Sequence, residues 1–177
     1  MNKDINRELN SFRGFTLIEL LAVIVVLAII ILIAVNAVLP QMDRARRNAL
    51  AIEANSAIQA AQSYFTAGNL MGGDTLPVGE GSWKCISIED LIKAGFYDAD
   101  VDTYKGSVQV TRSGGLFLYK VWIHNDEYQI VGAGVDTTTN TNKDVALDDV
   151  KNYEGNWKDL YNNCDKASSS GGESTGN

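Results

Sequence analysis

Residues 13–39, RGFTLIELLAVIVVLAIIILIAVNAVL, form the apolar stretch around which the rest of this chain is organised. Sixteen apolar residues follow one another without a break from Leu20 to Val35. The segment from Leu17 to Leu39 is long enough to cross a hydrocarbon core of roughly 30 Å as a helix. The sequence therefore predicts a membrane-spanning helix near the amino terminus.

Glu19 places a carboxylate at the start of this apolar run. An acidic side chain at the bilayer centre costs about 2.5 to 3.5 kcal/mol, and less near the end of a span. Two interpretations stay open on position alone. Either the carboxylate reaches the lipid headgroups, or it marks a functional position that needs a cationic partner.

The residues around Glu19 favour the second interpretation. Gly14 to Glu19 spell G-F-T-L-I-E, between a short charged leader and the apolar run. This pattern resembles the class III signal of type IV pilins and pseudopilins, in which a prepilin peptidase cuts after the glycine and methylates the new amino terminus. The resemblance implies cleavage between Gly14 and Phe15 and N-methylation of Phe15. The membrane helix is then retained, whereas an ordinary secretory signal has its apolar region before the cut.

The same resemblance gives Glu19 a partner. A carboxylate in a low dielectric is stabilised by a cation within about 4 to 6 Å, and the freed amine of Phe15 lies one helical turn back. In the family, the glutamate instead meets the amino terminus of a neighbouring subunit. Because an unpaired buried charge is disfavoured while a paired one is tolerated, this pair would act as a docking check. Glu19 and Phe15 are therefore the expected assembly residues.

Composition and charge restrict the remaining possibilities. The chain has 177 residues and a formal charge of −7, which predicts one small soluble domain beyond the apolar segment. Removal of the leader, with three basic and two acidic residues, would leave −8. Such a charge argues against a general affinity for nucleic acid, which requires a basic stripe. The charges flanking the span do not decide its orientation, and the resemblance implies a cytoplasmic leader.

A second helical segment is predicted from Gln41 to Ala67, with Gly68 as its stop. Its apolar residues recur at spacings of three and four and form one stripe: Leu50, Ala54, Ala57, Ile58, Ala61 and Phe65. If this segment continues the apolar helix, a rod of about 52 residues would reach roughly 78 Å. Such a helix would project from the soluble domain, and its first half would need lipid or copies of itself as cover.

Pro40 interrupts the expected rod. Proline lacks an N–H, and its ring clashes with the carbonyl four residues back, which belongs to Asn36. Pilins that this chain resembles usually carry a proline where it has Asn36, and often a glycine where it has Ala28. We therefore expect any unwinding during filament assembly to centre on residues 36–40, with a simple kink as the alternative.

The residues after Gly68 predict a small sheet. Residues 69–82 are rich in glycine and indicate a loop, and Ser87 is the expected N-cap of a two-turn helix that Gly95 ends. Three runs rich in β-branched and aromatic residues follow, with glycine and Asn-Asp turns between them: Ser107 to Arg112, Leu116 to His124 and Glu127 to Gly132. They predict an antiparallel meander with one face on the helix stripe, and residues 132–150 are expected to form a surface loop.

Cys85 and Cys164 are the two cysteines of the chain. In an exported domain such a pair indicates a disulfide, and closing a loop of this length is worth about 4 to 5 kcal/mol. Pilins commonly close a carboxy-terminal loop in this way, although here the bridge would enclose the whole sheet. The alternative is two separate thiols.

No enzymatic motif is present in the sequence, and no cofactor is expected. His124 stands alone at the end of a strand, without a serine or cysteine to activate, and is interpreted as a turn residue. No metal site is predicted. Four acidic residues of the surface loop leave calcium open as an alternative, as in the secretion pseudopilins that the chain also resembles: Asp136, Asp144, Asp148 and Asp149.

The sequence thus predicts an α+β, pilin-like fold in five parts. These are a cleaved leader (1–14), a transmembrane and filament-core helix (15–39), an amphipathic helix half (40–68), a globular head (69–165) and a disordered tail (166–177). The expected function is a type IV pilus subunit, first in the membrane and then in a surface filament. Its expected partners are other pilins, prepilin peptidase, the assembly machinery and membrane lipid. A type II secretion pseudopilin and a membrane-anchored adhesin that never polymerises are the alternatives.

Overall fold

The computed structural model describes residues 15–73, 75–100 and 102–155. The leader, the predicted tail and Cys164 lie outside these ranges. The chain divides into two compact units, residues 1–42 and residues 43–177, which are considered separately below. Its elements, in chain order, are α1 (Leu17–Leu70), β1 (Trp83–Ser87), α2 (Ile88–Lys93), β2 (Lys105–Ser113), β3 (Leu116–His124), β4 (Tyr128–Ala133), β5 (Val135–Asp136), β6 (Thr141–Asn142), a 3-10 turn (Leu147–Asp149) and β7 (Val150–Asn152).

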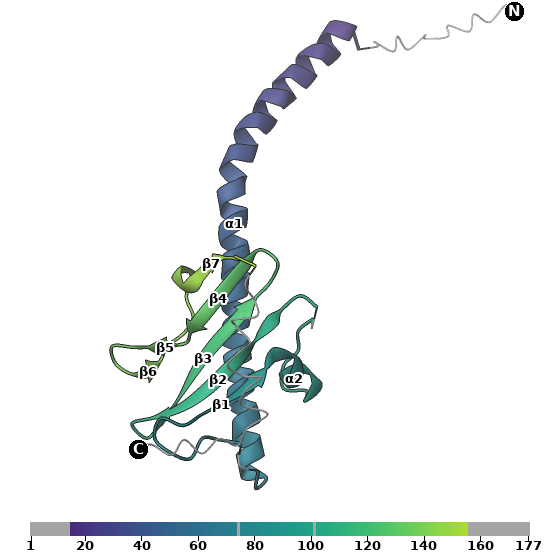
Figure 1. The fold of residues 1–177 in the computed structure, drawn as a ribbon. Coiled ribbons are helices and arrows are strands. Elements are labelled where there is room, and N and C mark those ends of the chain that lie inside the picture. Colours follow the sequence, from purple (N-terminus) through teal and green to yellow (C-terminus); the bar gives the residue numbers. More distant parts are fainter. Residues whose placement is uncertain (1–14, 74, 101, 156–177) are drawn as a thin grey trace, which may run out of the picture. The chain divides into compact units, whose positions relative to one another are not determined.

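The second unit is an antiparallel sheet packed on the carboxy-terminal part of α1 (Figure 1). The order of its five strands is β1-β2-β3-β4-β7, and β5 and β6 form a separate two-stranded hairpin. The core lies between the helix and one face of the sheet, where Val108, Val110 and Val121 are fully buried. The α+β class and the meander predicted from the sequence are confirmed.

The predicted apolar stripe of α1 is confirmed as the helix side of this core. Leu50, Ala54, Ala57 and Ala61 are completely buried, and Ile58 and Phe65 nearly so. Small alanine side chains let the helix approach the sheet closely, and the larger residues at either end fill the remaining space. The helix-facing side chains of the sheet alternate along each strand with side chains on the opposite face.

The predicted stop at Gly68 is wrong by two residues. α1 continues to Leu70, and the chain then turns at Gly72, whose φ is +84°. The amide of Gly73 donates to the carbonyl of Gly68 at 2.9 Å, and the amide of Gly72 donates to that of Asn69 at 3.2 Å. This pair of bonds is a Schellman motif, which places the left-handed glycine after the helix end rather than in its last turn.

The tight turn and the short helix follow the sequence prediction. Gly114 and Gly115 join β2 to β3 with φ values of +59° and +80°, as a two-residue hairpin turn requires. The hydroxyl of Ser87 accepts a hydrogen bond from the amide of Asp90 at 3.0 Å and caps α2. Gly95, with a φ of +74°, follows the end of α2.

Residues 132–150, expected to be one surface loop, contain the β5–β6 hairpin and the 3-10 turn. Gly132, with a φ of +66°, is the extra residue at a register shift between β3 and β4, and β4 ends at the next residue, Ala133. The side chain of Asn142 then makes hydrogen bonds to the backbone of β3, as a neighbouring strand would. Its Oδ1 accepts from the amide of Tyr119, and its Nδ2 donates to the carbonyl of Phe117, each at 2.8 Å.

The β4–β7 edge of the sheet is joined to α1 by a polar cluster. The hydroxyl of Tyr128 donates to the carboxylate of Asp43, and this bond holds the pKa of Asp43 below its ordinary value. Arg47 bonds the other oxygen of Asp43 at 2.9 Å, reaches Asn152 at 2.9 Å and stacks on the Tyr128 ring. These contacts fix the short strand β7, which has little strand pattern of its own.

Candidate processing and assembly site

The first unit presents an apolar surface that the described residues leave uncovered. Side chains from Leu17 to Leu39 are exposed, with Leu17 at 91%, Leu32 at 70% and Val35 at 47%. By length and composition this part of α1 is able to cross a membrane. An exposed apolar surface of this extent indicates contact with lipid or with other protein.

The carboxylate of Glu19 folds back onto the first turn of α1. Its Oε2 accepts from the backbone amide and from the hydroxyl of Thr16, both at 3.0 Å. The amide of Glu19 donates in return to the Thr16 hydroxyl at 3.3 Å. This reciprocal pair is a capping box, which satisfies two amides at the helix start that have no partner in the helix.

Thr16 is the residue of this site that sequence reasoning missed. The signal was present, because Thr16-Leu17-Ile18-Glu19 has the T-x-x-E spacing of a capping box before an apolar run. Both residues follow the expected cut after Gly14, so the capping box would persist in a processed chain. The structure therefore gives Glu19 a local role, in starting the helix, besides the assembly role expected for it.

The structure places the other predicted site residues as follows. Phe15 is 82% exposed immediately before α1, and Gly14 lies outside the described residues. α1 continues through Asn36 and Pro40, and Nδ2 of Asn36 donates to the carbonyl of Leu32 at 3.1 Å. Unwinding of residues 36–40 during assembly stays a prediction.

Cys85 lies in the edge strand β1, opposite Gln109 of β2. Its predicted partner Cys164 is outside the described ranges, so the disulfide also stays a prediction. Cys85 is on the face of the sheet opposite Ile86, which belongs to the core.

The acidic residues of the predicted surface loop hold turns together. Oδ1 of Asp136 accepts from the amides of Thr138 and Thr139, at 2.8 and 3.4 Å. Oδ2 of Asp149 accepts from the amide of Ala146 at 2.9 Å, and Oδ1 lies 3.8 Å from the ammonium of Lys143. Over residues 15–73, 75–100 and 102–155, no group of three or more His, Cys, Asp or Glu side chains is placed to hold a metal ion.

His124 is the last residue of β3 and is 6% exposed, rather than a turn residue. Its ring stacks on Tyr153 at a centroid distance of 4.6 Å, and its Nδ1 lies 3.3 Å from the carbonyl of Asn125. No hydrogen-bond partner for its buried Nε2 is found among the described residues. Burial lowers the pKa of His124, and the contact with the Asn125 carbonyl partly offsets this shift. The charge of Lys105 lowers the pKa further, and that of Asp126 raises it.

This environment predicts a pH dependence of folding. A histidine whose pKa is lower in the folded than in the unfolded state binds fewer protons when folded. Stability is therefore full above the unfolded pKa of about 6.5 and falls as the pH drops below it. The His124→Phe variant retains an aromatic ring against Tyr153 and should lose less stability over that interval. Thermal melts at pH 7.5 and at successively lower values, down to about pH 5, measure the difference; equal losses in both proteins would refute it.

Comparison with known proteins supports the reading of the amino terminus. Residues 9–35 match a family model described as the prokaryotic N-terminal methylation motif. No curated protein and no solved structure matched the chain.

The motif and the fold support the same class of protein. A methylation motif followed by a long apolar helix, with an antiparallel sheet after it, supports a type IV pilin or pseudopilin. The motif and the apolar helix support a membrane-anchored precursor, and the motif implies processing by prepilin peptidase and pilin-type assembly. The motif is common to pilins and pseudopilins, so the choice between them rests on other features.

Proposed function

We propose that this chain is a structural subunit of a type IV pilus and not an enzyme. Prepilin peptidase would cut after Gly14 and methylate Phe15, and the assembly machinery would then move the subunit from the membrane into a cell-surface filament. The filament would serve adhesion, motility or a related surface function. The observation that carries this proposal is the exposed apolar part of α1 from Leu17 to Leu39, which we call the stem. The Thr16–Glu19 capping box begins it.

The stem requires apolar contacts both in the membrane, before assembly, and in the filament. Burial of apolar surface is worth roughly 25 cal/mol per Å², and most stem side chains are at least half exposed. Lipid supplies the cover before assembly because the segment has the length of a bilayer core. In a filament outside the membrane, only the stems of other subunits provide a comparable apolar surface, so stems would bundle together.

Glu19 gives this bundle its register. In a packed bundle of stems the carboxylate loses water, and its bonds to Thr16 leave its charge without a counter-ion. The methylated amine of Phe15 in a second copy is the cation that the same processing creates. A subunit that docks out of register would leave both charges unpaired, which is strongly unfavourable.

A pilus is preferred to a secretion pseudopilus because of the acidic loop. A pseudopilin would differ in the length of its fibre and in a structural calcium, whereas here Asp136 and Asp149 accept hydrogen bonds from backbone amides of their own turns. The carboxylate of Asp136 stabilises the turn of the β5–β6 hairpin, and that of Asp149 stabilises the 3-10 turn. This structural use of both side chains favours the pilus subunit over the pseudopilin.

The proposal is tested by electron microscopy of material sheared from cells that make this chain. Long fibres that bind antibody against the head are expected. A Gly14→Ala variant, which removes the glycine at the cut, should give none and should remain in the membrane fraction. Fibres formed equally well by that variant would refute the proposal. A wild-type chain confined to the membrane would instead favour the adhesin that does not polymerise.

A further inference from the structure

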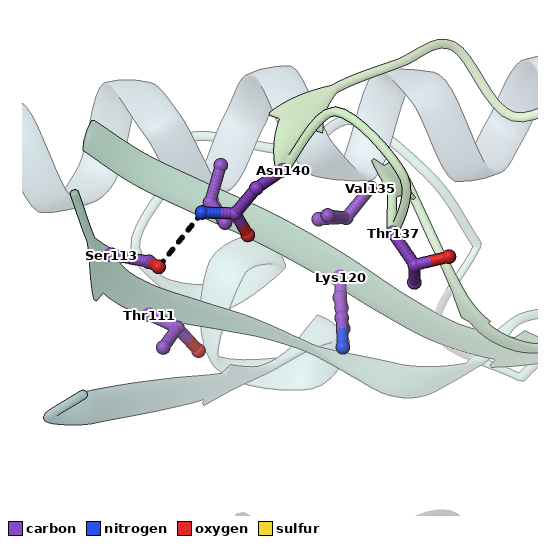
Figure 2. Close-up of a pocket in the computed structure, with 7 residues that line it drawn as sticks. Thr111, Ser113, Lys120, Val135, Thr137 and Asn140 are labelled. Atoms are coloured by element: carbon purple, nitrogen blue, oxygen red, sulfur yellow. Dashed lines mark hydrogen bonds between the residues drawn. The ribbon is translucent and has the colours of Figure 1, made fainter.

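A cavity of about 230 Å³ lies on the face of the sheet opposite the buried valines (Figure 2). Its floor comes from neighbouring strands β2 and β3, and its wall from the β5–β6 hairpin and the turn between those strands. Five of its seven lining residues have polar or charged side chains, although apolar atoms make up the larger part of its surface: Thr111, Ser113, Leu118, Lys120, Val135, Thr137 and Asn140. Pockets for drug-sized molecules measure about 300 to 1,000 Å³, so this cavity suits a smaller group.

The walls of this cavity are fixed by interactions of the hairpin. Nδ2 of Asn140, a residue with a φ of +53°, donates to the hydroxyl of Ser113 at 2.8 Å and closes one end (Figure 2). The side chain of Asn142 holds β6 against β3 through two bonds of 2.8 Å. Oδ1 of Asp136 accepts a hydrogen bond from the amide of Thr138 and stabilises the turn that contains Thr137. A cavity held in this way is largely formed before a ligand enters, which reduces the entropy lost on binding.

Lys120 supplies the charge in this cavity. Its half-buried side chain lies between Thr111 and Thr137 in the close-up (Figure 2). None of the ion pairs found among the described residues involves Lys120: Arg46–Glu127, Arg47–Asp43, Lys93–Glu89 and Lys143–Asp149. An ammonium that is partly removed from water and lacks a counter-ion favours an anion beside it.

The charge of the whole chain limits which anion the cavity can bind. The formal charge is −7, so a polyanion meets repulsion from the rest of the molecule, whereas a small monoanion meets mainly Lys120. A carboxylate carries one charge at neutral pH, but a phosphate group carries about 1.5 to 2. One ammonium therefore suits a carboxylate better than a phosphate.

The neutral lining favours hydroxyl groups next to that carboxylate. The hydroxyls of Thr111, Ser113 and Thr137 donate and accept hydrogen bonds, and so does the amide of Asn140. Sugar hydroxyls have the same dual capacity. Leu118 and Val135 offer a small apolar surface to the C–H groups of a ring. We propose that this cavity binds one carboxylate-bearing sugar unit of the uronic acid type.

The proposal is tested by titrating the ¹⁵N-labelled full chain in detergent micelles with D-glucuronate. Amide shifts are expected at Thr111, Lys120 and Asn140, with a dissociation constant in the millimolar range. D-glucose, which lacks the carboxylate, and acetate, which lacks the hydroxyls, should each bind at least about tenfold more weakly. Shifts of equal size with acetate would refute a sugar site, and shifts absent from the cavity would refute the site itself.

Matched variants locate the binding group. Lys120→Gln should weaken glucuronate binding about tenfold or more, whereas Lys151→Gln, an exposed lysine on β7, should leave it unchanged. Thr137→Val removes one hydroxyl of the wall while retaining the shape of the side chain. This variant should weaken the binding of glucuronate more than the binding of acetate. Retention of full affinity in both Lys120→Gln and Thr137→Val would overturn the proposal.

Discussion

Replacing Glu19 by glutamine is expected to abolish fibre formation while leaving the start of α1 intact. Glutamine at the third helical position still completes a capping box with Thr16, so the local bonds of the carboxylate have a neutral substitute. It cannot neutralise the amine of a neighbouring subunit. An uncompensated charge in a buried interface costs about 3 to 5 kcal/mol, and this penalty would recur at every subunit of the fibre.

Two further variants separate the charge of Glu19 from its capping role. Glu19→Ala removes both and should also give no fibres. Thr16→Ala removes the cap, worth about 1 kcal/mol, but leaves the carboxylate, and should assemble at a reduced yield. Immunoblots that compare the amount of the protein in the sheared fraction with the amount in the cell-bound fraction measure fibre assembly by all three variants. If Glu19→Gln assembles normally while Thr16→Ala does not, the task of the carboxylate would be capping and not subunit pairing.

Replacing Gly134 by alanine should destabilise the head by about 3 to 4 kcal/mol. Gly134 has a φ of +109°, which side chains rarely allow. A Cβ here would lie 2.5 Å from the carbonyl oxygen of Tyr119 and 2.9 Å from Cδ1 of Ile58. Backbone of β3 cannot move aside without disturbing the sheet, so the hairpin would be displaced.

A matched glycine isolates the steric part of this effect. Gly81 has a φ of +74°, and an added Cβ there meets no atom of the described residues within 4 Å. Gly81→Ala should therefore show only the cost of the left-handed backbone, about 1 kcal/mol. Thermal denaturation of the two variants should differ by about 10 °C or more. Similar melting temperatures would contradict the close approach of Gly134 to β3.

Elements with a local signal were predictable from the sequence. The apolar residues of α1 recur with the helix period over several turns, and the core of the structure uses the predicted residues from Leu50 to Phe65. The bounds of β3 agree with the prediction because Gly114-Gly115 and Asn125-Asp126 delimit an uninterrupted run. In each case the information lies within a few residues of the element that it specifies.

Elements that depend on distant contacts were not predictable. The edge strands β1 and β7 are five and three residues long, and each becomes a strand because a neighbour offers its unpaired backbone. The hairpin of β5 and β6 is fixed by the side chain of Asn142, whose partners lie more than 20 residues earlier. Gly68 was an ambiguous stop because Gly72 and Gly73 follow it closely, and a Schellman motif needs the later glycine.

The assembly site was predictable in its charge but not in its geometry. A charged residue within an apolar run is energetically costly, so Glu19 could be selected as a candidate, and the surrounding G-F-T-L-I-E motif favoured a functional role. Its bonds to Thr16 become evident only when the T-x-x-E spacing is combined with a helix that begins at Leu17. The cavity around Lys120 has no sequence signal, because its lining comes from β2, β3 and the turn after β5.

The central claim is that the apolar stem is retained after cleavage behind Gly14 and is then covered by the stems of other subunits. The mass of the amino-terminal peptide of the chain recovered from the cell surface tests it most directly. We predict a peptide that begins at Phe15 and carries one additional methyl group on its amine. A surface chain that still contains residues 1–14, or an unmodified amino terminus at another position, would contradict this account.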